Sequence, residues 1–331
     1  MSALIDTLAA ASRHWIGDAP TGAMMGAMRA FVAAATADEA VAREAAGSLR
    51  DREPGSSAFI AVALGSLVER GASAEISGPA VLDELRAWLP KLPGADDDDT
   101  SAVPTPPVPT AEEAMLLARF QFLCQSAVTH LAKLPEERAT LGHDTALLER
   151  LVGLRTHSYG AWWVHEALVK TSGTLIVLHP PSATGLRLRF ANVSIGYQLF
   201  SLLQTAVGTR LPGGRQPDET IARVARGQGS EKVTDTAWWH YGRPQSGPPD
   251  RKTRVWGESL VRDWSRVDGQ PVLLLWPPVG EPDTWSSSFL GPHLEAMPAD
   301  ASVEGMLTAE EAGAWLEKLG TARQRKRWWP F

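Results

Sequence analysis

The chain has 331 residues, 44% of them hydrophobic, and a formal net charge of −6 at pH 7. This composition suffices for the core of one large domain or of two ordinary ones, and it excludes a disordered chain. The acidic charge argues against nonspecific nucleic-acid binding by the whole molecule. The one cysteine, Cys124, rules out an intramolecular disulfide and a multi-cysteine metal site, which suits a reducing cytoplasm.

The sequence contains no candidate for a membrane span. A spanning helix needs about 18 or more consecutive apolar residues, and the strongly apolar runs here are shorter and broken by Arg, Glu or Pro. The amino terminus lacks the basic segment and long apolar stretch of a secretory signal. We therefore expect a cytoplasmic protein.

Residues 1–93 carry helix signals in the expected order. The pattern Thr36–Glu39 resembles a capping box, and an apolar run with helical spacing extends from Ser57 to a stop at Gly71. Pro79 is typical of the first turn of another helix. We expect a helical N-terminal domain over residues 1–93.

Residues 94–109 combine four adjacent aspartates with four prolines. Such a segment cannot pack a core and favours an extended backbone, so it is predicted to be a linker. The alternating ligand positions and closing Glu of a calcium-binding loop are absent, so no metal is expected there.

Residues 110–331 are predicted to form a Trp-rich domain in which helices flank strands. Capping boxes at Thr110–Glu113 and Thr308–Glu311 predict the starts of its first and last helices. The other predicted elements are helices at 144–154, 159–170, 195–207 and 218–226, and strands at 175–178, 186–190 and 272–276. Clustered strands between helices favour the α+β class, with a small antiparallel or mixed sheet.

Tryptophan is the most unusual feature of the composition: the chain has 13, and 11 of them follow residue 160. An indole has a large apolar area and one N–H that needs a partner, so such residues build either a thick core or a recognition surface. Trp162, Trp163, Trp238 and Trp239, together with Arg243, are candidates to line a pocket for a planar or anionic ligand. The alternative is that these indoles cover the sheet.

The candidate catalytic residues are His157, His165, Glu166, His179 and His240. In one helix His157 and His165 would be two turns apart, too far to hold one ion, and no histidine pair has the spacing of a zinc-protease helix. We therefore expect no metal and consider general acid–base chemistry, with structural roles for these groups as the alternative.

No linear motif specifies a reaction or a cofactor. The Gly-rich segments 212–215 and 227–232 lack the spacing and the strand context of a phosphate-binding loop, so surface loops are favoured there. A serine nucleophile elbow is absent, and the apolar surroundings of Cys124 favour core packing. No cofactor is expected.

The C-terminal tail combines a basic stem with an aromatic tip. Its candidate partner-binding residues are Arg325, Arg327, Trp328, Trp329 and Phe331. Cations steer and indoles anchor, so such a tail can dock in a partner groove or lie on an anionic membrane surface. The alternative is that its rings pack on the molecule's own core.

Three hypotheses about function follow from these patterns. The leading one is a cytoplasmic protein-binding component of a larger assembly, which acts through a Trp-rich surface and the tail. The alternative is an enzyme without a linear motif, whose pocket in the C-terminal domain is lined by His, Glu and Arg. A nucleic-acid binder using residues 243–266 and the tail is less favoured, because acidic residues dilute the basic ones in that segment.

Overall fold

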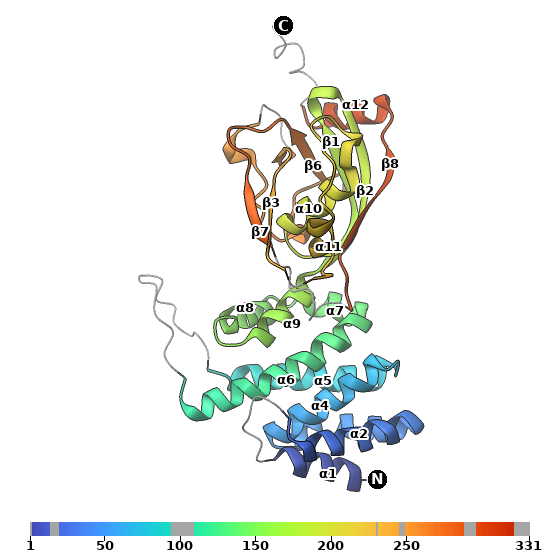
Figure 1. Cartoon of the computed structure of the whole chain (residues 1–331), viewed down its shortest axis with the longest axis vertical. Coiled ribbons are helices and arrows are strands. Elements are labelled where there is room, and N and C mark those ends of the chain that lie inside the picture. Colours follow the sequence, from blue (N-terminus) through green and yellow to red (C-terminus); the bar gives the residue numbers. More distant parts are fainter. Residues whose placement is uncertain are drawn as a thin grey trace. The chain divides into compact units, whose positions relative to one another are not determined.

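The computed structural model describes residues 2–13, 20–93, 109–229, 231–244, 249–287 and 296–320. The chain divides into two compact units, Met1–Leu168 and Val169–Phe331. Helices form the first unit, and the second is built around a mixed sheet (Figure 1). The predicted α+β class is confirmed.

Unit 1 is a stack of helices. They are α1 Ser2–Ser12, α2 Gly22–Ala37, α3 Glu39–Gly47, α4 Pro54–Glu69, α5 Gly78–Trp88, α6 Ala111–Lys133, α7 Pro135–Gly142, α8 Thr145–Leu154 and α9 Tyr159–Val169. Helix α6 follows the predicted linker in the sequence, and it packs on α4 and α5, which precede that linker. The two units therefore divide after Leu168, whereas the sequence suggested a boundary at residues 94–109, of which 94–108 lie outside the described residues.

Helix starts in the described residues follow from local hydrogen bonding. The capping boxes at Thr110 and Thr308 are confirmed, each with both reciprocal hydrogen bonds. The box predicted at Thr36–Glu39 is wrong: Thr36 lies inside α2, where its hydroxyl donates to the Val32 carbonyl. Asp38 caps α3 instead by accepting a hydrogen bond from the amide of Ala40 at 2.9 Å, which satisfies one of the free N–H groups in the first turn of that helix.

The core of unit 1 surrounds α4, most of whose residues are buried. The Trp88 ring stacks on Phe120, and the Trp88 Nε1–H donates to the buried carboxylate of Glu84 at 2.8 Å. The thiol of Cys124 is buried in α6, as expected, and burial raises its pKa well above the ordinary value. This thiol is therefore a packing group and not a nucleophile.

Unit 2 contains a six-stranded sheet of order β4-β6-β1-β2-β8, with β5 paired to β6, and a separate β3-β7 pair. The strands are β1 Thr171–His179, β2 Thr184–Val193, β3 Val233–Thr236, β4 His240–Gly242, β5 Arg266–Val267, β6 Gln270–Trp276, β7 Thr284–Ser287 and β8 Asp300–Met306. The strands predicted at 175–178 and 186–190 are confirmed as parts of β1 and β2, which pair antiparallel, and β6 runs parallel to β1, which makes the sheet mixed.

The sequence missed β3, β4, β5, β7 and β8. Four of them have four residues or fewer, too few for alternation to stand out. The segment 209–253, predicted to hold loops and one short helix, contains β3 and β4 as well as that helix, α11 Glu219–Ala225. Strand β8 contains Asp300, Glu304 and Gly305, residue types that are uncommon in strands.

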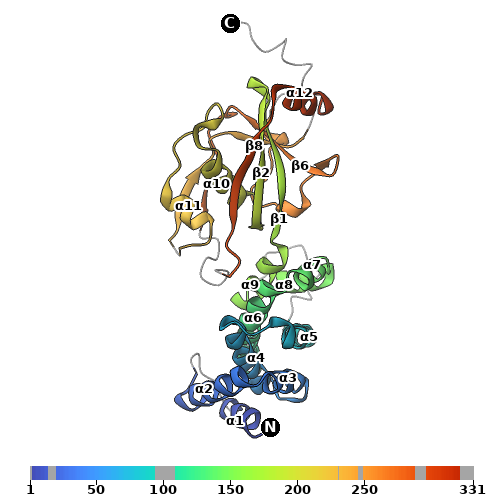
Figure 2. The same cartoon turned by 90° about the vertical axis from the view of Figure 1, so that its right-hand side faces the viewer.

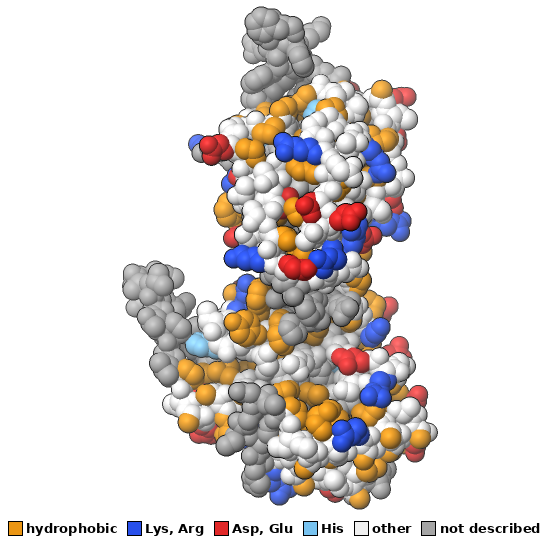
Figure 3. Space-filling view, viewed as in Figure 1, with side chains coloured by type: hydrophobic (Ala, Val, Ile, Leu, Met, Phe, Trp, Pro, Cys, Tyr) orange, Lys and Arg blue, Asp and Glu red, His pale blue; other side chains and the backbone are white. Residues whose placement is uncertain are grey.

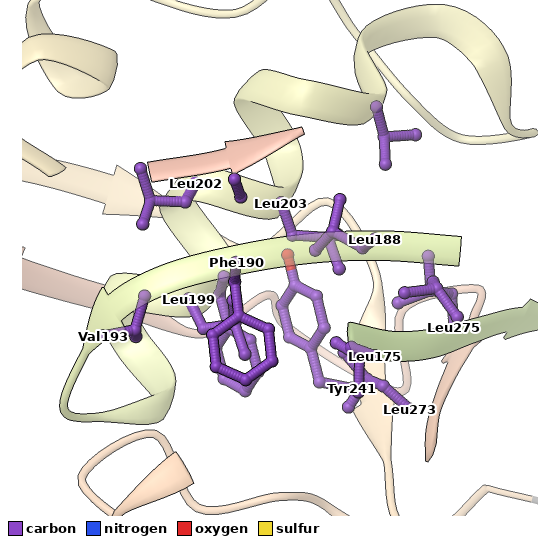
Figure 4. Packing of buried hydrophobic residues seen from close by; sticks show 14 of the residues in the cluster. Leu175, Leu188, Phe190, Val193, Leu199, Leu202, Leu203, Tyr241, Leu273 and Leu275 are labelled. Carbon is purple, nitrogen blue, oxygen red and sulfur yellow. The ribbon is translucent and has the colours of Figure 1, made fainter. Parts of the chain in front are cut away.

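Both faces of the large sheet are covered. Helix α10 Gly196–Val207 and α11 lie on one side of strands β1, β2 and β8 (Figure 2). On that side a large apolar cluster, which we call the α10-face core, contains Leu199, Tyr241 and alternate residues of β1 and β6; Figure 4 shows its packing. Helix α12 Ala309–Lys318 packs on the opposite face with Ile176 and Leu178.

Candidate functional site

A buried polar network holds the aromatic residues of unit 2 in place. Ser201 and Gln204 on α10 donate to the carboxylate of Asp235, at 2.6 and 3.1 Å. The Gln204 Oε1 accepts from the Tyr241 hydroxyl at 2.6 Å and from the Trp238 amide at 3.0 Å. Burial raises the pKa of Asp235, and the hydrogen bond from the Ser201 hydroxyl partly offsets this rise. These polar groups are satisfied inside a core, which indicates a structural role.

Aromatic rings pack directly on this network. Phe200 and Tyr241 stack with their centroids 3.8 Å apart, and Tyr197 stacks on Trp285 at 5.0 Å. In Figure 4 the Tyr241 ring lies among leucines of the sheet. Phe200, Tyr241 and Trp285 are buried and belong to the α10-face core, so these rings serve packing.

Trp239, a candidate ligand-binding residue, belongs to this core. It is 2% exposed, and its Nε1–H donates to the Pro212 carbonyl at 2.7 Å. Gly213, with φ of +83°, approaches the indole so closely that an added Cβ would lie 3.0 Å from Nε1. The glycines at 213 and 214 therefore form a tight turn beneath Trp239, a packing role that the composition alone did not reveal.

The described indoles differ sharply in exposure. Trp88, Trp163, Trp239 and Trp285 are buried. Those of intermediate exposure are Trp162, Trp238, Trp264, Trp276 and Trp315. Among the described residues only Trp256 is an exposed indole, at 49%. A continuous Trp-rich surface is therefore not seen in this part of the chain, and the aromatic pairs 162–163 and 238–239 contribute mainly to packing.

Trp256 lies beneath a guanidinium group. The Arg254 Cζ is 5.6 Å from the centroid of the Trp256 ring, a cation–π geometry. Arg254 also forms an ion pair with Asp283, which lies in the loop between β6 and β7. Arg254 thus contacts both the exposed Trp256 ring and the carboxylate of Asp283.

A polar cleft of about 300 Å³ adjoins Arg254. Its polar lining consists of His240, Arg254, Glu281 and Asp283, and Trp239 contributes to the wall. Burial and the carboxylate of Asp283 raise the pKa of the nearby Tyr197. The sequence pointed to Trp239 and His240 but not to Arg254 or Asp283, which are 29 residues apart and carry no local signal.

His240 is the one predicted catalytic candidate that lines this cleft. Its side chain is buried, and its Nε2 has no hydrogen-bond partner among the described residues. Burial and the positive charge of Arg254 lower the pKa of His240. The imidazole is therefore neutral at pH 7, with an unpaired ring nitrogen.

The other candidates do not meet His240 within unit 2. Side chains alternate along a strand. Val177 and Tyr241 both belong to the α10-face core. His179 is two residues after Val177 and points to that face, whereas His240 precedes Tyr241 and points to the opposite one. The two imidazoles cannot share a proton directly, and His179 Nδ1 pairs instead with Ser182 Oγ at 2.7 Å.

The remaining candidates lie elsewhere. In unit 1, His165 Nδ1 is 3.7 Å from Glu166 Oε1 on α9, and His157 precedes that helix. Arg243 is exposed next to β4. The tail candidates Arg325, Arg327, Trp328, Trp329 and Phe331 lie outside the described residues.

Charge on unit 2 is mixed. Arg254 and Arg262 of the segment 243–266 pair with Asp283 and Asp263. Figure 3 shows Lys and Arg side chains interspersed with Asp and Glu on the face of unit 2 in view. Such alternation provides no continuous cationic track for a phosphate backbone.

The described residues contain no group of three or more His, Cys, Asp or Glu side chains that could hold a metal ion. In the same part of the chain, no helix has both the length and the apolar character needed to cross a membrane. Comparisons with family models, curated proteins and solved structures found no match.

Acidification is expected to destabilise the protein, because burial lowers the pKa values of His130, His179 and His240. As the pH falls through the ordinary histidine pKa of about 6.5, the unfolded chain takes up protons that the folded chain resists. Stability is thus full at neutral pH and is lost below about pH 6.5. Urea unfolding at pH 7.5 and 5.5 should show a lower midpoint at pH 5.5, with a smaller drop in His130→Gln. Equal midpoints for the parent would contradict this expectation.

Proposed function

We propose that this chain is a cytoplasmic protein-binding component of a larger assembly, which docks through a surface centred on Trp256 and through its C-terminal tail. The single observation that carries the first part is an indole exposed by 49% beneath the guanidinium of Arg254. Trp and Arg are the residues that most often dominate binding energy at protein interfaces. The buried Cys124 thiol fits a reducing compartment.

The polar cleft extends this surface. Arg254 belongs both to the cation–π pair and to the cleft lining, so an apolar anchor and a polar recess adjoin each other. We name Trp256, Arg254, His240, Glu281 and Asp283 the Trp256 surface. A protein partner that covers Trp256 with an apolar side chain and places hydrogen-bonding groups in the cleft would match both features.

The tail is the second part of the proposal. Its sequence places Arg323, Arg325, Lys326 and Arg327 directly before Trp328, Trp329 and Phe331. Cations accelerate encounter with an acidic partner, and large rings provide buried contact area. We expect truncation after Gly320 to weaken partner binding.

The enzyme alternative needs an acid–base partner for His240. Asp283 and Glu281 line the same cleft, but Asp283 is paired with Arg254, and His240 Nε2 is buried without a partner among the described residues. Proton transfer needs hydrogen-bond reach, directly or through one water. The geometry therefore favours binding over catalysis.

Site-directed photo-cross-linking tests the proposal. A photoreactive amino acid is placed at position 256 or, as a matched control, at Tyr159, an aromatic residue of unit 1 that is 69% exposed. We expect a discrete cross-linked partner from position 256 and none from position 159. The partner is then purified and titrated with the full chain and with the chain ending at Gly320. Cross-links of equal yield from both positions, or no saturable binding by the purified partner, would overturn the proposal.

A further inference from the structure

A second cleft in unit 2, of about 180 Å³, lies where β1 begins, next to the β5-β6 hairpin. Its polar lining consists of Thr171, Ser172, Thr174, Arg262, Arg266 and Gln270. The lining contains two guanidinium groups and no carboxylate. Its charge therefore favours an anion.

Arg266 retains donors that a ligand can use. A guanidinium has five N–H donors. Arg266 is exposed and uses one of its donors on the Gly269 carbonyl at 3.1 Å. Arg262 also belongs to the lining and forms an ion pair with Asp263, whose Oδ1 is 3.7 Å from the Arg262 Nε.

Hydroxyl groups face the same cleft. Thr171 and Thr174 line it and are partly exposed, so that a ligand can reach them. The Ser172 Oγ accepts from the Asn192 amide at 3.0 Å, which leaves its O–H to donate elsewhere. Three O–H donors therefore lie beside the two arginines.

The backbone of β1 is irregular at this point. The β1-β2 register shifts between Thr171 and Gly173, as in a β-bulge. Bulges redirect side chains and occur often next to binding sites. Without the irregularity, Thr171 and Ser172 would follow the regular alternation of the strand.

We propose that this cleft binds a phosphate group, either inorganic phosphate or the phosphate of a small monoester. A volume of about 180 Å³ is smaller than the sites that enclose drug-sized ligands, roughly 300–1,000 Å³, so it suits an oxyanion with a short substituent. Arginine donates two parallel N–H bonds to such an oxyanion, and hydroxyls complete the tetrahedral set. We name this site the anion cleft. It shares no lining residue with the Trp256 surface.

Isothermal titration of the full chain with sodium phosphate, at constant ionic strength set by chloride, tests the anion cleft. Glycerol 3-phosphate forms a second arm, which distinguishes a monoester from free phosphate. Sulfate forms a third, and binding of sulfate as tight as that of phosphate would overturn the assignment to phosphate. We expect saturable 1:1 binding of phosphate or of the monoester.

Arg266→Gln is expected to weaken that binding at least about tenfold, because it removes a charge-assisted contact. Arg215→Gln, a change at another exposed arginine of unit 2, is the matched control and should leave binding unchanged. Thr174→Val removes one O–H with little change in shape and should weaken binding severalfold, which keeps the test informative if Arg266→Gln fails to fold. Absence of saturable binding, or equal affinities for the parent, Arg266→Gln and Thr174→Val, would overturn the proposal.

Discussion

Replacement of Gln204 by Ala is expected to lower the free energy of unfolding by about 3 to 5 kcal/mol. Gln204 is buried and joins three groups: it accepts from the Tyr241 hydroxyl and the Trp238 amide, and it donates to Asp235. Each buried polar group left without a partner costs about 1 to 3 kcal/mol, and the truncation also leaves a cavity. Most of the lost stability should therefore come from the groups that Gln204 leaves unpaired, and not from the removal of its own amide.

Urea unfolding followed by near-ultraviolet circular dichroism measures this change, because Trp238, Tyr241 and Trp285 report on the surroundings of the network. Gln125→Ala, at an exposed glutamine of α6, is the control, and we expect it to change stability by less than about 0.5 kcal/mol. The loss of stability in Tyr241→Phe should lie between those of Gln204→Ala and Gln125→Ala, since this change removes one hydroxyl and preserves the ring. A Gln204→Ala variant as stable as the control would show that the network does not support the core.

Replacement of Trp239 by Ala is the second large effect that we expect, a loss of about 3 to 5 kcal/mol. The indole is 2% exposed, packs edge-on against Tyr241, and donates to Pro212 in the glycine turn. Its removal leaves a cavity and an unpaired carbonyl. Trp256→Ala is the matched control, because that ring is exposed and its main described contact is Arg254.

We expect Trp256→Ala to change stability by less than about 1 kcal/mol, the range of an exposed cation–π pair. Thermal and urea unfolding of the two variants therefore separate a core indole from a surface indole. Losses of similar size in both variants would mean that Trp256 serves the fold, and the docking surface would then have no anchor.

Elements with strong local signals were predictable from the sequence. The capping box at Thr110 follows from hydrogen bonding within four residues, and β6 follows from a run of apolar residues at 272–276. Strands β3 and β7 are different, because each exists through pairing with the other across about fifty residues. Four-residue strands gain their stability from such partners and not from their own propensities.

The candidate site was predictable only in fragments. Local patterns marked His240 and the Trp-rich segments, but they did not show that His179 and His240 point to opposite faces, which depends on strand register. They did not distinguish Trp239 from Trp256 either, although one is in the core and the other is exposed. Exposure depends on how distant segments pack, and periodicity is absent in the irregular segments that carry these two residues.

If the exposed Trp256 anchors a protein partner, loss of its ring weakens the complex, which the Kd of the cross-linked partner for purified variants measures. We expect Trp256→Ala to raise the Kd at least about 30-fold, equivalent to the 2 kcal/mol or more of a binding hot spot. Tyr159→Ala, in unit 1, should leave the Kd unchanged. An unchanged Kd for a correctly folded Trp256→Ala variant would show that this indole does not anchor the partner.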